Sequence, residues 1–281
     1  MFNTKWIILI LIILMILLLF YLSSDLQRQY KAEVQEGLAE TKKLENTILT
    51  EKDIAYLPEP VQKYLKYVGV LEKERVSSLH VTINGAMKTD KDKDWANVDV
   101  QQYSFFNQPT RLFFLKMNMS GIPIIGLHAY KNAKATMDIK VAGIFPVVDG
   151  KGKEMNQGET VTVFNDMCIL APASLIDERI QWETIDTQTV RATFTNEDIK
   201  INAILYFNEE GQLINFVSDD RYYSPTGKTY QSVRWSTPIS DYKNIDGFNL
   251  ATYGEAIWNF SEGDYCYAKF NIKAVAYNVD Q

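Results

Sequence analysis

The sequence has very few of the side chains from which recognisable active sites are built. Its 281 residues include two histidines, His80 and His128, and two cysteines, Cys168 and Cys266. Their spacing matches no zinc site, and we expect no metal centre. No stretch matches a phosphate-binding glycine loop, a dinucleotide fingerprint or a G-x-S-x-G nucleophile turn. The sequence therefore predicts no cofactor and favours a non-catalytic protein.

The sequence also has fewer positive than negative charges. Lysine and arginine number 29 against 35 aspartate and glutamate residues, which gives a formal net charge of −6. This balance argues against a surface that binds nucleic acid. The apolar share of 46% is sufficient for a large core. The two distant cysteines leave two states open, a disulfide in an oxidising compartment or two buried free thiols.

Charge is absent altogether from residues 6–22, WIILILIILMILLLFYL. A helix of this length rises by about 25 Å, close to the thickness of a bilayer's hydrocarbon core. Trp6 and Tyr21 stand at its ends, where aromatic rings prefer the membrane interface. The exit Tyr21-Leu22-Ser23-Ser24 fits a signal-peptidase site poorly. We therefore predict a short tail at residues 1–5 and a transmembrane anchor at residues 6–22. The protein would be a single-pass plasma (inner) membrane protein with an extracytoplasmic C-terminal part.

Residues 23–50 are charged, and we interpret them as a helical stalk or linker. Leu26, Tyr30, Val34 and Leu38 recur at four-residue steps, which predicts one narrow apolar stripe along a helix. Two interpretations remain open at this point. The helix is either a stalk that sets the distance from the membrane or pairs with a partner, or it lies against the folded domain.

The stretch LPEPVQKYLKYVGV, Leu57 to Val70, predicts a short amphipathic helix. Pro58 and Pro60 suit a helix start, and Gly69 suits its end. Val61, Tyr64, Leu65 and Val68 share one face at i, i+3, i+4 and i+7. So short a helix is marginal alone, and its apolar face must pack on the rest of the domain.

From Val76 onward the pattern is that of β-strands. Leu79, Val81 and Ile83 alternate with polar residues, and turn sequences such as Asn244-Ile-Asp-Gly247 separate similar runs. Closely spaced strands with tight turns predict an antiparallel meander. The stretch between Gly158 and Asp177 changes to helical spacing and is interrupted by Pro172. We predict a mainly β (α+β) fold for residues 51–281, a single domain. It would be a curved antiparallel sheet or half-barrel of about ten strands with two helical segments on its concave side.

Two polar stretches are interpreted as surface structure. Asp149 to Glu159, DGKGKEMNQGE, alternates lysines with acids and predicts a solvated connection. Asp219-Asp220-Arg221 follows a strand pattern and predicts a salt-bridged turn.

Three segments together resemble a bacterial family of unknown function. They are LPEPVQKYLKYVG, QWETIDTQTVRATFT and WSTPISDYKNIDGFNLATYGEAIW. The family shares an L-P-x-P-V-x-x-Y-L helix and a late W…DY…DG…GE..W pattern, and the resemblance covers roughly residues 54–277. It implies an architecture similar to the lipoprotein-carrier (LolA-like) half-barrels, and it supplies no catalytic residues. Likeness of fold by itself assigns no function.

The feature that points toward function is an excess of apolar side chains around Leu112 to Tyr130. Leu112 and Phe114 alternate with Phe113 and Leu115, so both faces of a strand carry large apolar groups. Either a second layer covers the outer face, or the concave face is lined for an apolar guest. Methionine suits such a guest because its side chain adapts to varied shapes. The residues expected to line a ligand cavity are Tyr64, Leu65, Phe113, Leu115, Met117, Met137, Ile139, Phe164 and Met167.

We therefore expect a membrane-anchored, non-catalytic protein that binds a lipid or another apolar ligand. The alternative is a cell-envelope scaffold with a fully packed core, which acts through a protein partner. A third reading is an enzyme with an unrecognised site. A polar pocket that grouped His128 with two carboxylates would support the enzyme.

Overall fold

The computed structural model describes residues 4–41, 47–119 and 121–279. Residues 1–3 of the predicted tail and 42–46 of the predicted stalk lie outside this part of the chain. The helices are α1 (Thr4–Ser23), α2 (Asp25–Thr41), α3 (Glu51–Ile54), α4 (Glu59–Val68), α5 (Lys153–Ile169) and the 3-10 helix η1 (Pro172–Ile176). The strands are β1 (Ser78–Met87), β2 (Ala96–Phe105), β3 (Thr110–Met119), β4 (Ile122–Lys131), β5 (Lys134–Val141), β6 (Phe145–Lys151), β7 (Ile180–Thr184), β8 (Thr189–Asn196), β9 (Ile199–Phe207), β10 (Leu213–Ser218), β11 (Tyr222–Tyr223), β12 (Gln231–Ser232), β13 (Arg234–Ile245), β14 (Phe248–Phe260) and β15 (Gly263–Tyr277).

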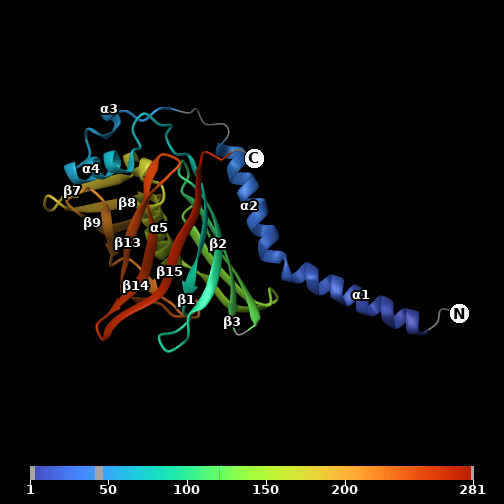
Figure 1. Ribbon diagram of the computed structural model, residues 1–281. Coiled ribbons are helices and arrows are strands. Elements are labelled where there is room, and N and C mark those ends of the chain that lie inside the picture. The colour runs from blue at the N-terminus through green and yellow to red at the C-terminus, as the bar shows by residue number, and fades with distance from the viewer. Residues whose placement is uncertain (1–3, 42–46, 120, 280–281) are drawn as a thin grey trace.

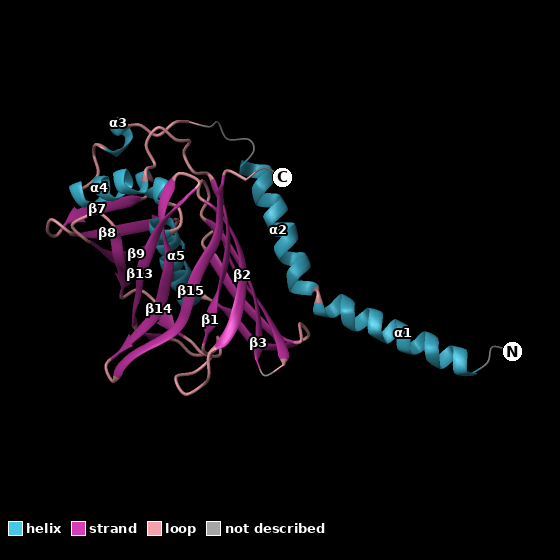
Figure 2. Cartoon of the chain, in the orientation of Figure 1, coloured by secondary structure: helices cyan, strands magenta, loops and turns pink. Residues whose placement is uncertain are grey.

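One long antiparallel sheet forms the body of the protein (Figures 1 and 2). Its 13 strands follow the order β6-β5-β4-β3-β2-β1-β15-β14-β13-β10-β9-β8-β7. The first and last strands of the sheet in the chain, β1 and β15, pair at its centre, from Leu79 opposite Tyr277 to Met87 opposite Ala268. Two meanders therefore extend in opposite directions from this central pair, and the sheet curves around α5. The mainly β class and the curved antiparallel sheet are confirmed.

The predicted number of about ten strands is too low. The sheet has 13 strands, and β11 and β12 form a separate ribbon. The edge strand β6 shows why a sequence pattern undercounts, because most of its residues are exposed and it has no alternation of buried and exposed positions. β7 at the other edge has one buried residue, Ile180. Edge strands without a buried face lack the period of two by which strands are recognised.

Helix α5 fills the inside of the curved sheet and begins earlier than the sequence suggested. It starts at Lys153, so the interpretation of residues 149–159 as a solvated connection is wrong. From Gly158 onward the helix is buried on nearly all sides, and its buried residues include Glu159, Thr160 and Asn165 beside apolar ones. The first part of the helix has no apolar period of 3.6 residues in the sequence, because polar side chains that form hydrogen bonds and ion pairs inside the protein occupy buried positions. Pro172 then opens η1, as its fixed φ permits at a helix start.

Helix α4 confirms the amphipathic helix predicted from LPEPVQKYLKYVGV. It spans Glu59–Val68 and buries Val61, Tyr64, Leu65 and Val68. Gly69 ends it in the left-handed conformation, with φ +79°, and its N–H donates to the carbonyls of Leu65 and Lys66. A side chain at this φ would be strained, which is why glycine ends the helix.

Helix α2 covers part of the outer face of the sheet. Its stripe of Leu26, Tyr30, Val34 and Leu38 is buried in a cluster with Phe105, Leu112, Phe114, Leu127 and Ala129. The Tyr30 ring stacks on Phe114 with centroids 5.1 Å apart. Of the two interpretations of the stripe, packing against the domain is therefore correct. The apolar outer face around Leu112 is explained by this second layer.

Helix α1 extends away from the sheet (Figure 1) and meets it only near its end. At that end Lys140 Nζ on β5 lies 3.0 Å from Asp25 Oδ2, at the start of α2. Within the described residues, no helix combines the length and the apolar character needed to cross a membrane. The predicted transmembrane anchor at residues 6–22 is not supported.

Candidate functional site

Two adjoining cavities lie between α5 and the concave face of the sheet. The smaller cavity has a volume of about 150 Å³ and lies between α5 and strands β1 to β4 and β13 to β15. The larger cavity has a volume of about 260 Å³ and is bounded by β1, β3 to β6, β14, β15, α5 and β11 with the loop that follows it. Five residues line both: Met87, His128, Glu159, Arg221 and Tyr267. We call these five residues the partition.

Five of the nine predicted ligand-binding residues line the two cavities. Phe113 lines the smaller cavity. Leu115, Met117, Met137 and Ile139 line the larger one. Alternation along β3 and the pairing of β3 with β4 and β4 with β5 bring these side chains to the concave face.

The remaining predicted residues, from helices α4 and α5, are packed in the core. Tyr64 and Leu65 are completely buried, and the Tyr64 hydroxyl donates to the Cys168 carbonyl at 2.8 Å. Phe164 stacks on Phe194 with centroids 5.3 Å apart, and Met167 is completely buried. Both cysteines are free, and of the two only Cys168 is buried, whereas Cys266 is half-buried. A ligand-binding role for these helix residues has no support from their positions.

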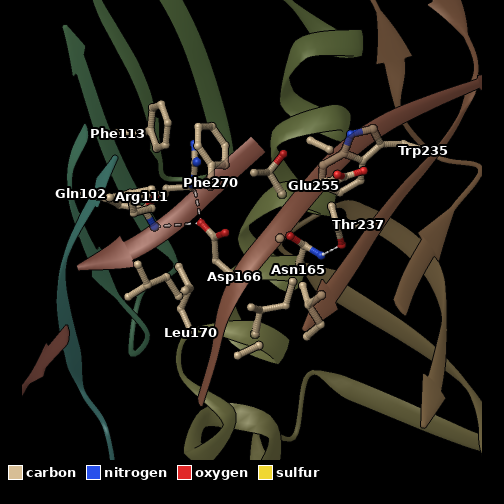
Figure 3. Close-up of a pocket in the computed structure, with 18 of the residues that line it drawn as sticks. Gln102, Arg111, Phe113, Asn165, Asp166, Leu170, Trp235, Thr237, Glu255 and Phe270 are labelled. Carbon is tan, nitrogen blue, oxygen red and sulfur yellow. Dashed lines mark hydrogen bonds and ion pairs between the residues drawn. The ribbon is translucent and has the colours of Figure 1, made fainter. Parts of the chain in front are cut away.

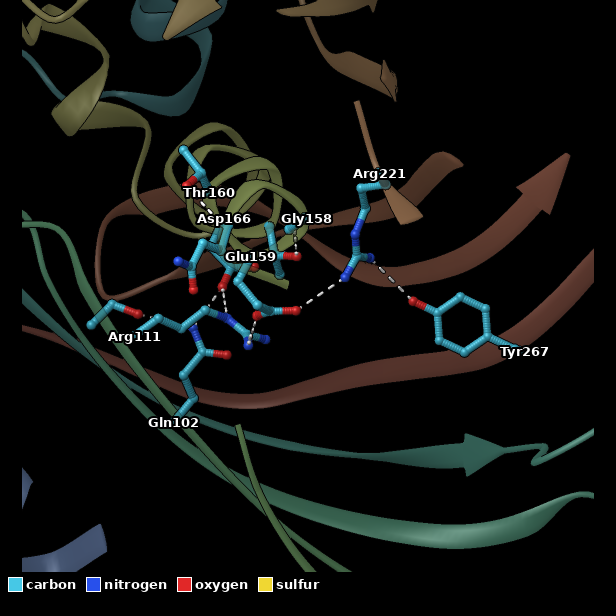
Figure 4. Close-up of polar contacts among 11 residues, drawn as sticks. Gln102, Arg111, Gly158, Glu159, Thr160, Asp166, Arg221 and Tyr267 are labelled. Atoms are coloured by element: carbon cyan, nitrogen blue, oxygen red, sulfur yellow. Dashed lines mark hydrogen bonds and ion pairs between the residues drawn. The ribbon is translucent and has the colours of Figure 1, made fainter. Parts of the chain in front are cut away.

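A buried network of charges lies beside the cavities (Figures 3 and 4). Glu159 and Asp166 are seven residues apart on α5 and therefore share one face of the helix. Arg111 on β3 donates from Nε to Asp166 at 2.6 Å and from a terminal nitrogen to Glu159 at 3.3 Å. Arg221, before β11, donates to the other oxygen of Glu159 at 3.1 Å. Gln102 on β2 adds a hydrogen bond of 2.8 Å to Asp166.

Aromatic rings hold both guanidinium groups in place. Arg111 lies over the Phe113 ring at 4.5 Å, and Arg221 lies over Trp235 at 4.2 Å. A planar guanidinium can stack on an aromatic face and at the same time donate hydrogen bonds to a carboxylate from its edge. The Tyr267 hydroxyl lies between the Trp235 indole N–H, at 3.2 Å, and Arg221, at 3.5 Å. The two arginines are therefore held in position by residues of the sheet as well as by the carboxylates of α5.

Burial and paired charges move the pKa values of this site in different directions. Burial alone would raise the pKa of Glu159, but Arg111 and Arg221 outweigh it and the pKa is lowered. For Asp166 burial dominates over Arg111 and Gln102, and the pKa is raised. Burial lowers the pKa of His128 to about 4, with Glu159 acting in the opposite direction. At neutral pH the imidazole is therefore uncharged.

Two nitrogens of the partition are buried and have no hydrogen-bond partner among the described residues. They are Nε2 of His128 and Nε of Arg221. An unpaired buried donor or acceptor costs about 1–3 kcal/mol, so such groups call for a specific explanation.

His128 and three carboxylates, Glu159, Asp166 and Glu255, line the smaller cavity, so the kind of polar pocket that would support an enzyme is present. Glu255 accepts a hydrogen bond from the Tyr253 hydroxyl at 2.6 Å, which lowers its pKa. The pKa values of Glu159 and His128 are both lowered, away from the range of a general base at neutral pH. Glu159 and Asp166 are held by guanidinium groups, and a histidine with a pKa of about 4 is a weak base. Among the described residues no group of histidine, cysteine and carboxylate side chains is placed to hold a metal ion.

The charge network was not predicted from the sequence. Asp219 pairs with Arg234 at 2.8 Å as a surface turn would, but Arg221 points inward to Glu159. The interpretation of Asp219 to Arg221 as one salt-bridged turn is wrong for the arginine. One signal was present: Arg111 is a lone charge at the start of the apolar run LFFL, and charged residues in such positions are rarely buried without a partner. The partner could not be identified because it lies on α5, about 50 residues away.

Comparison with known proteins identifies the family. Residues 47–270 match the family model described as "Family of unknown function (DUF6544)". The chain belongs to this family. This match confirms the prediction that the chain belongs to a family of unknown function. No curated protein matches the sequence.

Several solved structures are similar to this one. A LolA superfamily protein from Nitrosomonas europaea has 12% identity and a TM-score of 0.40, with 78% of this chain and 91% of that chain covered. A putative outer membrane lipoprotein-sorting protein domain from Vibrio parahaemolyticus has 9% identity and a TM-score of 0.37, with coverage of 72% and 85%. A DUF1329 family protein from Desulfovibrio piger has 10% identity and a TM-score of 0.42, with coverage of 79% and 93%. At these values the likeness bears on neither ligand nor site.

Proposed function

We propose that this protein is a non-catalytic binding protein that takes the acyl chain of a lipid, or a similar apolar molecule, into the larger cavity. One observation carries the proposal: a cavity of about 260 Å³ on the concave face is walled mainly by aliphatic, methionine and aromatic side chains, with a minority of polar ones such as Lys88 and Glu154. Ligand sites are typically concave and mostly apolar, with a few polar groups. Met117, Met137 and Met155 supply adaptable walls for a chain of variable shape.

The rim of the larger cavity supports the access of an apolar molecule. Val147 lines the cavity and is 53% exposed, and Phe145 on the same edge strand is 65% exposed. Large apolar side chains grouped at the edge of a cavity are typical of a binding surface.

The scaffold alternative lacks this kind of support. Such a scaffold would act through its surface and its stalk, and the apolar stripe of α2 is buried against the outer face of the sheet. That stripe is therefore not open to a partner protein.

We also propose that the chain is attached to a membrane through residues 6–22, with the sheet on the extracytoplasmic side. The support is a run of exposed apolar side chains on α1: Trp6, Ile8, Leu9, Ile10, Leu11, Ile12, Ile13, Leu14 and Met15. Alkaline extraction of membranes from cells that make the full chain tests this attachment, and release of the protein would contradict it.

A cavity-filling substitution tests the binding function. Met117→Trp places a large ring in the larger cavity, while Lys116→Trp places the same ring on the opposite, exposed face of β3. We expect the full chain to bind the uncharged fluorophore N-phenyl-1-naphthylamine. Met117→Trp should weaken that binding about tenfold or more, because the ring occupies the ligand's volume. Equal binding by both variants, at equal thermal stability, would show that the ligand does not use the cavity.

A further inference from the structure

The partition places polar groups between the mainly apolar larger cavity and the more polar smaller one, which Gln102, Asn165 and Glu255 also line. His128, Glu159 and Arg221 line both cavities, whereas most other residues of the larger cavity are aliphatic or aromatic. A ligand that extends from one cavity into the other must pass these groups. A pure hydrocarbon would leave Nε2 of His128 and Nε of Arg221 without a partner, and buried polar groups are normally paired.

The charges of the network are already balanced within the protein. Arg111 and Arg221 face Glu159 and Asp166 at distances of 2.6 to 3.3 Å, and these four side chains are 6 to 13% exposed. His128 is uncharged at neutral pH. An anionic head group would have to displace Glu159 from a guanidinium and leave that carboxylate buried without its partner. The network therefore does not favour an ionised ligand.

What remains unpaired at the partition is suited to an uncharged polar group. Nε of Arg221 is a hydrogen-bond donor, and Nε2 of His128 donates or accepts according to its tautomer. Space for such a group exists beside the arginine. Gly158 lines the larger cavity, and a Cβ placed on it would lie 4.0 Å from Arg221 Nε, with its nearest other neighbour, the Tyr222 backbone nitrogen, at 3.9 Å.

We propose that the two cavities form one site for an amphipathic molecule with an uncharged hydrogen-bonding group, an ester or a hydroxyl. That group lies at the partition, beside Gly158, and pairs with Arg221 Nε and His128 Nε2. The apolar chain lies in the larger cavity. This inference rests on the proposed function and specifies the class of ligand.

Three ligands of similar chain length but different head group test the proposal. They are monoolein, which has an ester and hydroxyls, oleate, which is an anion, and 1-octadecene, which has no polar group. Each displaces N-phenyl-1-naphthylamine from the full chain in a fluorinated surfactant that mixes poorly with hydrocarbon chains. We expect monoolein to displace the fluorophore at a concentration about tenfold lower than the other two, as one or two added hydrogen bonds predict.

Two variants assign the preference to the partition. His128→Leu removes one polar partner without changing the charge of the network. Gly158→Ala fills the space beside Arg221 and has a favourable helix propensity, so the fold should be kept. Either change should bring the affinity for monoolein close to that for 1-octadecene and leave the affinity for 1-octadecene within about twofold.

The possible outcomes distinguish a failure of this inference from a failure of the proposed function. Equal displacement by monoolein and 1-octadecene, or a uniform loss for all three ligands in both variants, would overturn the inference and keep the apolar cavity. Strongest displacement by oleate would also overturn it, and would implicate Lys88, a cation on the wall of the larger cavity. Failure of the fluorophore and of every ligand to bind would instead refute the proposed function.

Discussion

At the scale of single residues, the central feature is a closed charge network inside an apolar domain. Glu159 accepts from both Arg111 and Arg221 and is 6% exposed. Buried ion pairs of this kind contribute little net stability compared with well-packed apolar residues, but loss of one partner is costly. Their retention beside two cavities is consistent with a role in ligand selection.

Glu159→Gln should destabilise the fold by about 3–5 kcal/mol, because it leaves two buried guanidinium groups without their shared carboxylate. Urea unfolding of the full chain measures the change. Glu183→Gln is a matched control, since Glu183 pairs with Arg191 at 2.7 Å but is 63% exposed, and its loss should cost at most about 1 kcal/mol. A similar small effect at both positions would show that Glu159 is not held as the structure describes.

His128 should make the protein sensitive to mild acid. Its pKa is lowered from 6.5 to about 4 by burial, so between these values the unfolded chain binds a proton that the folded chain does not. Stability therefore falls as the pH drops through this window, by about 3 kcal/mol for this residue.

The pH dependence is isolated by comparison with His128→Leu. Glu159, with a lowered pKa, also loses stability in acid below its ordinary value of 4.5, whereas Asp166, with a raised pKa, gains relative stability as the pH falls. These contributions are present in both proteins and cancel in the difference. Between pH 7 and pH 4, the free energy of unfolding should fall by about 3 kcal/mol less in His128→Leu than in the wild type. An equal fall in both proteins would refute a buried, neutral His128.

At the scale of elements, α2 and α5 sandwich the β3–β4 region from opposite sides. Along β3, Leu112 and Phe114 pack against α2, while Phe113 and Leu115 face α5 and the cavities. The apolar excess of this strand thus has two causes, an outer helix and an inner cavity wall. The cavity wall is held rigid because the same strand is covered on its outer face.

Val34→Asp should release α2 from the sheet, because it puts an unpaired charge into the buried cluster around Tyr30 and Phe114. Hydrogen exchange should then show loss of protection in α2 and increased exchange in β3 and β4, with β8 and β9 unchanged. Gln35→Asp, on the exposed side of the same helix, is the control and should leave all of these rates as they are. Cooperative unfolding of the whole sheet in Val34→Asp would contradict the view of α2 as a separate outer layer.

The elements also show what sequence reasoning could predict. The α4 helix and most strands were predictable because local signals define them: the prolines and Gly69 for α4, and an apolar period of two for strands such as β1 and β9. The edge strands and the first turn of α5 were not. Edge strands have no buried face, and α5 buries polar side chains whose partners lie on distant strands.

The site was predictable only where it is apolar. Leu115, Met117, Met137 and Ile139 could be placed on one face by alternation alone, and the structure brings them to the larger cavity. Arg111, Glu159 and Arg221 come from β3, α5 and the segment before β11, so only the tertiary fold places them together. A polar site assembled from distant segments leaves no motif in a single sequence.

At the scale of the whole molecule, the pairing of β1 with β15 joins two meanders into one sheet. The N-terminal meander supplies the aliphatic and methionine walls of the larger cavity, the C-terminal one adds Trp258, Tyr265 and Tyr267, and α5 carries the carboxylates of the charge network. Because α2 covers the outer face, a fragment that begins at residue 51 would expose Leu112 and Phe114. Experiments on ligand binding should therefore use the full chain.

The most direct test is to ask whether the purified full chain carries a lipid. Native mass spectrometry of the protein released from a mild surfactant, followed by extraction and analysis of any bound small molecules, answers this. The account predicts one lipid-sized molecule per chain with an acyl chain and an uncharged polar group, absent from Met117→Trp but present in Lys116→Trp. A mass equal to that of the polypeptide alone, unchanged after the addition of membrane lipids, would contradict the account.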